Sequence, residues 1–412
     1  MGEQTIIMTK FYGSNRDNLG LIINAGSSSL KFAVIDMTNS EFLLDGIGER
    51  LFEADATLNI TIRGAKKTKQ TIKYGSHKDA ISALLDVLGY DFNPVLVAHR
   101  VVHGGEYFRD AMKVDADVKE KIKACSILAP LHNPANLAGI EAAEHSFANT
   151  PQYVIFDTAF HSTLPPEAYR YALPQSLYEQ YSIRRYGFHG TSHHYVSGKT
   201  AVLMQRPLST INMVVAHLGN GCSATAIAGG KSLDTTMGFT PLDGLVMGTR
   251  SGSLDPSILL FLEKEAGMSS SDLDDLLNKK SGLLGLSELS NDMRTLEEYA
   301  LEGHKGAILA IEVFCFRLAK SIAGLMISLP SFDALVFTGG IGENSEVIRH
   351  KVCEKLKVLG LQIDTHLNVS VKDKADKISS SCSKTEVWVV GTDEELQIAQ
   401  QAYALFGQET SL

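Results

Sequence analysis

Cysteine is scarce in this sequence, and the few cysteines present are far apart. The 412 residues contain five, an odd number without any CxxC pair: Cys125, Cys222, Cys315, Cys353 and Cys382. A disulfide framework needs paired cysteines, and a cysteine zinc site needs closely spaced ones, so we expect neither. The pattern is typical of reduced thiols in a cytoplasmic protein.

The sequence also lacks a long uncharged hydrophobic run. Its most hydrophobic helical stretch, residues 307–328, contains Glu312, Arg317 and Lys320. We therefore expect a buried helix at a domain or subunit contact there, not a membrane span. Residues 1–18 have neither the apolar core nor the cleavage signal of a secretory peptide, and we expect a short mobile extension.

Positive charge is in deficit, because 38 Lys and Arg residues stand against 47 Asp and Glu residues, a net charge of -9. This balance disfavours binding to nucleic acids and to anionic membranes. The apolar share of 44% is that of an ordinary folded protein. A chain of this length exceeds one ordinary core, so we expect two domains.

A glycine turn between two apolar runs is the most informative stretch of the chain. In VVAHLGNGCSATAIA, Asn220, Gly221 and Ser223 stand at the turn, and an isolated arginine, Arg250, follows thirty residues after Asn220. Glycine lets backbone N–H groups approach an anion, and arginine offers a fork that fits carboxylate or phosphate. Taken alone, the stretch is equally typical of an ordinary hairpin.

The same pattern occurs near the amino terminus, in LIINAGSSSLKFAVID. Asn24, Ser29 and Lys31 supply an amide, a hydroxyl and a cation that suit phosphate. The GxxxxGK[ST] spacing of a P-loop is missing, and a serine-rich hairpin turn remains open for this segment alone. The two stretches indicate a duplicated unit.

Polar side chains follow the ends of predicted strands. Patterns of strands and helices alternate through the first half, which indicates an α/β fold. Arg100 follows a buried strand at residues 95–98, and Asp157 and His161 follow another in VIFDTAFH. Ligand crevices of parallel sheets open at such ends, although an arginine there also fits a structural ion pair.

Nine of the thirteen histidines lie between His99 and His217. His189 and His193 have the i, i+4 spacing of a metal pair, but the glutamate of HExxH is missing, so we expect no zinc site. We expect several of these histidines to be structural. Further along, DALVFTGGIGENSEVIRHKV predicts a strand, a double-glycine turn and a helix, a nucleotide-binding pattern distinct from GxGxxG.

Nine motifs stand in one order over nearly the whole chain: NAGSSSLK, AHRVVHGGE, PLHNP, FDTAFH, RRYGFHGTSH, HLGNG, TPLDGLVMGTRSG, FTGGIGEN and TDEE. Together they resemble the acetate kinase family. The resemblance implies a duplicated actin-like ATPase (ribonuclease H-like) α/β fold with two domains around an ATP cleft. The first would hold residues 1–157 and 394–412, and the second, residues 158–393, would carry the nucleotide site and a dimer contact.

The resemblance also implies a reaction, namely direct in-line transfer of a phosphoryl group between ATP and acetate, giving acetyl phosphate and ADP. It implies Mg2+, with Mn2+ as a substitute, and a cytoplasmic homodimer. Acetate is an anion at neutral pH because its pKa is roughly 4 to 5, so no general base is needed. The chemistry asks for stabilisation of the charge on the transferred group.

The family's roles fall on particular residues here. Arg100 and Arg250 would flank the carboxylate and the phosphoryl group, His189 would donate to the transition state, and Asp157 would organise Mg2+ and substrate. Metal contacts are implied for Asn24 and Glu394. ATP contacts are implied for Ser29, Lys31, His217, Asn220, Gly221, Asp292, Arg294, Gly340 and Asn344. The acyl pocket is implied to include Val102, Leu131, Phe188 and Pro241, with His132 beside the phosphoryl group.

Two alternatives stay open. Propionate-selective relatives tend, as the resemblance suggests, to have a smaller residue at the position of Val102, so valine favours acetate over a propionate or butyrate kinase. A non-enzymatic, actin-like or chaperone-like ATP switch would share the phosphate loops but has no need of the two arginines and His189. The chain departs from the family's PTNEE and SGDxDP at Asp393 and Ser253, which leaves Glu394 in place.

Overall fold

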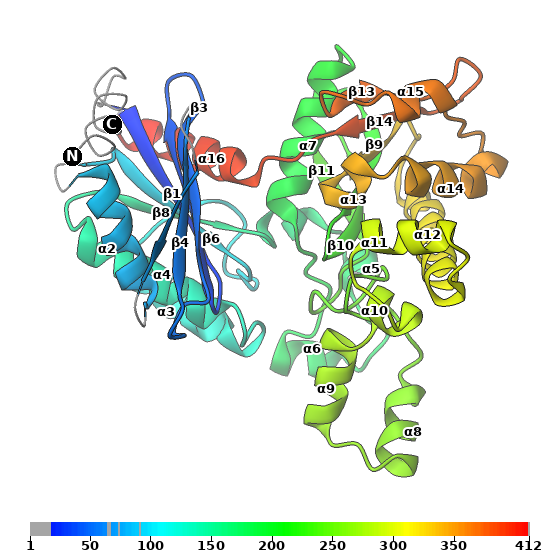
Figure 1. The fold of residues 1–412 in the computed structure, drawn as a ribbon, viewed down its shortest axis with the longest axis horizontal. Helices are drawn as coiled ribbons and strands as arrows, with labels where there is room; N and C mark the ends of the chain where they lie inside the picture. The colour runs from blue at the N-terminus through cyan, green and yellow to red at the C-terminus, as the bar shows by residue number, and fades with distance from the viewer. Residues whose placement is uncertain (1–17, 64–66, 73–74, 90–91, 411–412) are drawn as a thin grey trace. The chain divides into compact units, whose positions relative to one another are not determined.

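The chain forms two compact units in the computed structural model (Figure 1). The structure describes residues 18–63, 67–72, 75–89 and 92–410. The first unit comprises residues up to 159 and from 393 onward, and the second comprises residues 160–392. We expected the boundaries at residues 157 and 394. The expected mobile extension lies outside the described residues, except for Asn18.

The first unit contains a mixed eight-stranded sheet in the order β5-β4-β3-β2-β1-β6-β8-β7. Strands β1, β2 and β3 are antiparallel neighbours, whereas β1, β6 and β8 run parallel. The strands are β1 Leu19–Ala25, β2 Ser29–Asp36, β3 Glu41–Glu49, β4 Thr57–Ile62, β5 Thr68–Thr71, β6 Leu96–Val101, β7 Met112–Lys113 and β8 Gln152–Phe156.

Helices cover both faces of this sheet. The helices α2 His77–Leu88, α3 Ala116–Ala124 and α4 Asn133–Ser146 lie on one face, and α16 Glu394–Thr410 lies on the other (Figure 1). Side chains alternate along a strand, so Leu21 and Ile23 of β1 pack toward α2 and α4, while Ile22 packs with Ile398 of α16. Burial on both faces explains why the strand reads as a continuous apolar run.

The second unit contains a six-stranded sheet in the order β11-β10-β9-β12-β14-β13. Strands β9, β10 and β11 are antiparallel neighbours, whereas β9, β12 and β14 run parallel, which repeats the arrangement around β1 in the first unit. The strands are β9 Asn212–Leu218, β10 Cys222–Ala228, β11 Lys231–Thr235, β12 Ala334–Thr338, β13 Ala375–Lys377 and β14 Glu386–Val390. The repeated order confirms the predicted duplication, and both glycine turns are hairpins at the same position of their sheets.

Helix α7 Gly190–Leu203 packs on one face of the second sheet, where Val196 joins Met213 and Val215 of β9. Helix α12 Lys305–Leu325 contacts β9 and β10 from the other face. The remaining helices are α5 Pro166–Tyr169, α6 Gln175–Tyr181, α8 Ser257–Glu265, α9 Ser270–Lys279, α10 Gly282–Ser287, α11 Met293–Leu301, α13 Gly339–Asn344, α14 Glu346–Leu356 and α15 Thr365–Val369.

One local prediction is wrong. The double glycine after β12 forms no open turn, because Gly339 and Gly340 begin α13 directly. Gly339 has φ +75, and a Cβ there would lie 2.8 Å from the carbonyl oxygen of Leu218, so a larger residue would push β9 and β12 apart. The close approach places the start of α13 beside the β9–β10 turn.

All five cysteines are free, and four are buried. Burial raises the pKa of Cys125 to about 11 and that of Cys222 to about 12, so these thiols stay protonated at neutral pH. Within the part of the chain that the structure describes, no helix has the length and apolar character needed to cross a membrane.

Candidate active site

Four of the predicted residues meet in the first unit: Asn24, Arg100, Asp157 and Glu394, which we call the first half-site. Asn24 and Arg100 lie near the carboxyl ends of the parallel strands β1 and β6, and Asp157 directly follows β8. Glu394 begins α16. Carboxyl ends of parallel strands meet at one edge of a sheet, which brings these side chains together.

Arg100 is the centre of the first half-site. Its Nε donates to Oδ1 of Asp157 at 2.9 Å and its Nη2 to Oδ2 at 2.5 Å, a bidentate ion pair. Its Nη1 lies 3.5 Å from Oδ1 of Asn24, and its Nε lies 3.8 Å from Oε2 of Glu394. Burial opposes the charge, but Asp157 and Glu394 outweigh it and raise the pKa of Arg100 above its ordinary value. The guanidinium is a permanent cation.

Two buried asparagines that the sequence analysis missed hold this edge of the sheet. The Nδ2 group of Asn136 donates to the carbonyl of Ala25 at 2.6 Å, and its Oδ1 accepts from the N–H of Val102 at 3.0 Å. Asn133 accepts from the N–H of His103 at 3.1 Å. They clamp the ends of β1 and β6 onto α4. The HNPAN run at the start of α4 was the available signal.

The second unit brings together His189, Gly221 and Arg250, which we call the second half-site. A Cβ placed on Gly221 would lie 3.4 Å from Cε1 and Nε2 of His189 and 3.7 Å from Nη1 of Arg250. The ring and the guanidinium therefore face the glycine turn from two sides. His189 caps α7 with φ 57, a left-handed conformation that is costly outside glycine and is common at functional sites.

The histidine ring is fixed by its neighbours. Nδ1 of His189 lies 2.9 Å from Oγ of Ser223, and the ring packs against that of His217 with centroids 4.4 Å apart and an angle of 35° between the ring planes. His161 is one histidine with the expected structural role, because it is buried and bonds through both nitrogens, to Oγ of Ser232 and to the carbonyl of Phe188.

Arg250 differs from Arg100 in its surroundings. It donates to the carbonyl of Pro241 at 3.4 Å and lies 4.0 Å from the sulfur of Met247. Among the described residues, no Asp or Glu forms an ion pair with it. Burial lowers the pKa of Arg250 from its ordinary value. A partly buried cation without an acidic partner favours an anionic ligand.

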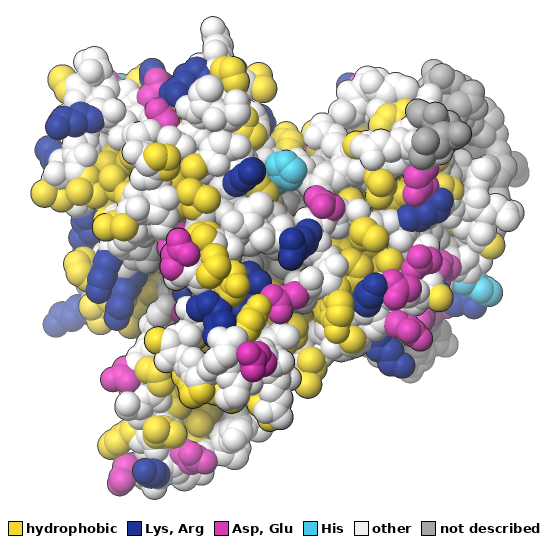
Figure 2. Space-filling view, turned by 180° about the vertical axis from the view of Figure 1, so that it is seen from behind, with side chains coloured by type: hydrophobic (Ala, Val, Ile, Leu, Met, Phe, Trp, Pro, Cys, Tyr) yellow, Lys and Arg dark blue, Asp and Glu magenta, His cyan; other side chains and the backbone are white. Residues whose placement is uncertain are grey.

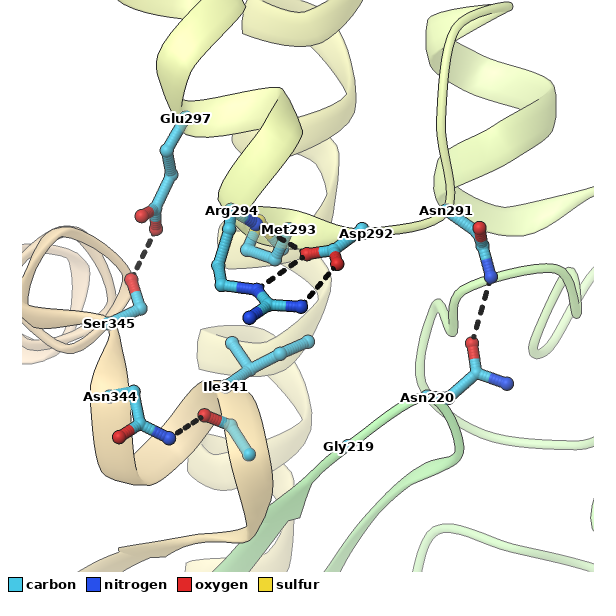
Figure 3. A pocket seen from close by; sticks show the side chains of 11 residues that line it. Gly219, Asn220, Asn291, Asp292, Met293, Arg294, Glu297, Ile341, Asn344 and Ser345 are labelled. Carbon is cyan, nitrogen blue, oxygen red and sulfur yellow. Dashed lines mark hydrogen bonds and ion pairs between the residues drawn. The ribbon is translucent and has the colours of Figure 1, made fainter. Parts of the chain in front are cut away.

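A pocket of about 790 Å³ opens in the second unit beside the glycine turn (Figure 3). Its lining includes five residues predicted to bind ATP: Asn220, Asp292, Arg294, Gly340 and Asn344. The other lining residues were not predicted from the sequence: Gly219, Asn291, Met293, Glu297, Ile341 and Ser345. The volume is that of a small-molecule site, and an elongated nucleoside fits such a space.

Figure 3 shows the guanidinium group of Arg294 folded back on Asp292, and Ile341 extending from α13 toward the same space. Asn220 accepts a hydrogen bond from Asn291 at 3.3 Å, which ties the glycine turn to the start of α11. Ser345 donates to Glu297. The pocket thus combines apolar walls with amide and hydroxyl groups, as purine sites require.

The comparisons with known proteins agree with this geometry. The model of the acetokinase family matches residues 19–400. The chain belongs to the acetokinase family. The resemblance seen in the nine ordered motifs is therefore confirmed.

Relatives of this acetokinase-family chain cover almost its whole length. An acetate kinase of Pseudomonas aeruginosa is 49% identical over 93% of this chain and 98% of its own. The crystal structure of Porphyromonas gingivalis acetate kinase matches with a TM-score of 0.90 at 38% identity, covering 94% of this chain and 100% of that one. A propionate kinase structure from Francisella tularensis matches with a TM-score of 0.88 at 45% identity, covering 93% and 98%. The fold prediction is confirmed.

A buried arginine, Arg349, fixes the end of α13, and it was not predicted from the sequence. It is 2% exposed, and its guanidinium donates to the carbonyls of Gly342 at 3.0 Å and Glu343 at 3.1 Å. It also donates to Oδ1 and the carbonyl of Asn368 at 2.7 and 2.8 Å. These bonds satisfy carbonyls at the end of α13, the helix that lines the pocket.

The residues predicted for the acyl pocket are divided between the two units. Val102, Leu131 and His132 lie in the first, and Phe188 and Pro241 in the second. Val102 is buried, whereas Leu131 is 63% exposed. Of the first phosphate loop, Ser29 is half-buried and Lys31 is exposed on β2. These assignments stay predictions.

Proposed function

We propose that this chain is an acetate kinase, which transfers a phosphoryl group reversibly between ATP and acetate and gives acetyl phosphate and ADP. The observation that carries the proposal is the high identity to proteins named acetate kinase over nearly the full chain. The pocket beside the glycine turn supports it independently, because it offers a nucleoside site where the sequence predicts one.

The adenosine of ATP is assigned to that pocket. Ile341 and Met293 supply apolar walls for a purine, and Asn344 and Arg294 supply polar contacts. The phosphates would then lie along Gly219, Asn220 and Gly221, whose turn borders the same space. Backbone N–H groups of a glycine turn bind phosphate oxygens at short range.

Charge stabilisation at the transferred group is assigned to Arg250, His189 and Arg100. Acetate needs no base, so the barrier lies in bringing two anions together and in the charge on the phosphoryl oxygens. Arg250 supports this role because it has no acidic partner among the described residues. Arg100 donates to Asp157 from Nε and Nη2, and its Nη1, which makes a long contact of 3.5 Å with Asn24, is the group that we expect to bind substrate.

The first half-site suits Mg2+, which prefers hard oxygen ligands and is often held by one or two carboxylates together with substrate phosphates. Glu394 and Asn24 are the candidate ligands that the family resemblance implies, whereas both oxygens of Asp157 accept from Arg100. Asp157 would fix Arg100 and act on the metal from a distance. Mg2+ would neutralise phosphate charge, and Mn2+, with the same ligand preference, would substitute.

Propionate kinase is the second candidate, favoured by the similarity to the Francisella tularensis structure. Val102 supports acetate because its buried side chain takes up room that a further methylene would need. One methylene is worth about 1 to 3 kcal/mol in an apolar pocket. Val102→Ala should therefore raise kcat/KM for propionate relative to acetate by roughly 10-fold or more.

The deciding experiment follows ATP formation from ADP and each acyl phosphate with Mg2+, using acetyl, propionyl and butyryl phosphate. Acetyl phosphate should give the highest kcat/KM. A folded, Mg2+-supplied protein that forms no ATP from any of them would overturn the proposal. The alternative of a non-enzymatic ATP switch would then be favoured if nucleotide caused the protein to assemble into filaments detectable by light scattering.

We also propose a cytoplasmic homodimer whose contact includes α12. That helix buries Phe314 and Leu318 against its own unit but exposes Leu309 and Phe316 by 54% and 58%. Helix α8 exposes Leu260 and Phe261 in addition, and Figure 2 shows hydrophobic side chains on the lower projection that α8 and α9 build. Sedimentation should give twice the mass of 44.7 kDa, and Phe316→Asp should give the monomer.

A further inference from the structure

Ser223 lies between two histidines of the second unit. Its Oγ is 2.9 Å from Nδ1 of His189 and 2.8 Å from Nε2 of His193. Ser223 and His193 are both fully buried, in β10 and α7 respectively. The serine has only one hydroxyl proton, so the two contacts cannot both be donated by it.

The other nitrogen of His193 constrains the direction of both bonds. Among the described residues, Nδ1 of His193 has no hydrogen-bond partner, although it is shielded from solvent. The pKa of His193 lies well below its ordinary value, mainly because the ring is buried and also because the rings of His161 and His217 are close to it. The ring is therefore neutral and carries one proton, on either Nδ1 or Nε2.

Only one arrangement leaves no buried proton without an acceptor. His193 carries its proton on Nε2 and donates to Ser223, and the Ser223 hydroxyl donates to Nδ1 of His189. The reverse direction would strand a proton on Nδ1 of His193. Donation from both rings would strand the serine proton, since Ser223 makes no other side-chain contact in the described chain. A stranded buried donor is costly, whereas an unmatched nitrogen lone pair is tolerated better.

We infer that His193 and Ser223 are positioning residues that fix the tautomer of His189, so that its proton sits on Nε2 and faces the Gly221 turn. Nε2 is the nitrogen nearest to that turn, with 3.4 Å to an added Cβ at Gly221. The relay thus presents an N–H donor beside Arg250 at the place assigned to the transferred group. The kinetic consequence rests on the proposed function, whereas the tautomer does not.

The tautomer can be measured directly on the full chain with 15N-labelled histidine, because long-range 15N–1H spectra distinguish the protonated ring nitrogen. The His189 signals are assigned by their loss in His189→Gln. We expect Nε2 of His189 to be protonated and Nδ1 to be a hydrogen-bond acceptor whose resonance moves in Ser223→Ala. Protonation on Nδ1, or an Nδ1 resonance unchanged by Ser223→Ala, would overturn the inference. Once the His189 signals are assigned, the wild-type spectrum can overturn the inference even where Ser223→Ala fails to fold.

Kinetics supply the second readout. Ser223→Ala should lower kcat by about 10-fold to 100-fold, as loss of orientation does, with KM values changed little. Thr225→Val is the matched control, because it removes a buried hydroxyl from the same face of β10, and the partner of that hydroxyl within the described chain is Oγ1 of Thr235 at 2.8 Å. It should keep wild-type kcat. Equal kcat in Ser223→Ala and wild type would count against the relay.

Replacing His193 separates hydrogen bonding from packing. The amide of His193→Gln can donate to Ser223 from nearly the position of Nε2, whereas His193→Leu cannot. We expect the glutamine variant to retain more kcat and the His189 tautomer of the wild type. Equal loss in both folded variants would assign His193 a packing role. A wild-type protein without kinase activity but with the expected tautomer would refute the proposed function and leave the relay in place.

Discussion

Mild acid should destabilise this protein through histidines that are buried in the neutral state. His99 is 2% exposed and bonds through Nε2 to Oε1 of Gln152 at 2.7 Å, and His161 is 1% exposed. Burial lowers the pKa of each to about 4. The unfolded chain binds a proton below about pH 6.5, but the folded chain does so only near pH 4, so acid favours unfolding throughout that window.

The size of the effect follows from the two pKa values. At pH 5 each histidine costs about 2 kcal/mol of folding free energy relative to neutral pH, and the two together about 4 kcal/mol. His193 adds to the loss in the same direction, because its pKa is also lowered. Above pH 7 the three side chains contribute no pH dependence, since they are neutral in both states.

His99→Gln isolates one of these contributions. His99 directly precedes Arg100 on β6 of the first unit, so the variant is compared by stability and not by activity, and glutamine can still reach Gln152. We expect wild type to lose about 2 kcal/mol more than the variant between pH 7 and pH 5, a difference in Tm of about 4 to 8 °C by calorimetry. Any fixed cost of the substitution cancels in this comparison. A wild-type-to-variant difference in Tm that does not change with pH would refute the reasoning.

Three further substitutions test the site. Gly221→Ala should fold normally, because its Cβ would make only ordinary contacts, the nearest at 3.4 Å. It should lower activity by about 100-fold or more, because the methyl group occupies the space in front of His189. Unchanged activity would show that the phosphate binds elsewhere. Arg250→Ala should lower kcat/KM by about 100-fold or more with little change in Tm, and near-normal kcat/KM would remove it from the mechanism. Arg349→Met should lower the free energy of unfolding by about 3 to 5 kcal/mol, because it leaves four buried acceptors without a donor. It should also raise KM for ADP more than KM for acetyl phosphate. A lower Tm with unchanged KM values would show that Arg349 has only a structural role.

Elements with local signals could be predicted from the sequence. Helix α2 has such a signal, because Ser76 and Asp79 form a capping box at its start. The hairpin turns could be predicted from the alternation of apolar runs and glycine. The start of α13 could not, because the left-handed Gly339 is required by packing against Leu218, which is distant in sequence.

The candidate site was predictable where residues lie in a motif and unpredictable where they act from a distance. Asn220, Asp292 and Asn344 belong to three segments that the fold brings to one pocket. Asn136 and Arg349 hold loops by hydrogen bonds to backbone carbonyls, and such partners leave no pattern in a single sequence. For Arg100, the open alternative of a structural ion pair is present, with Asp157 as the partner.

The duplicated fold carries different charge in its two copies, and this difference bears on the proposed ligands. In the first half-site the cation Arg100 stands with two carboxylates, Asp157 and Glu394, so the local charge is negative and suits a metal ion. In the second, Arg250 stands beside a glycine turn and has no acidic partner among the described residues, so the local charge is positive and suits an anion. The two half-sites thus have the same topology but different charge, which supports the proposal of Mg2+ at the first and of phosphate at the second. Reversing the sign in the second copy alone, with Arg250→Glu, should abolish phosphate binding while Mn2+ binding to the first, followed by electron paramagnetic resonance, persists.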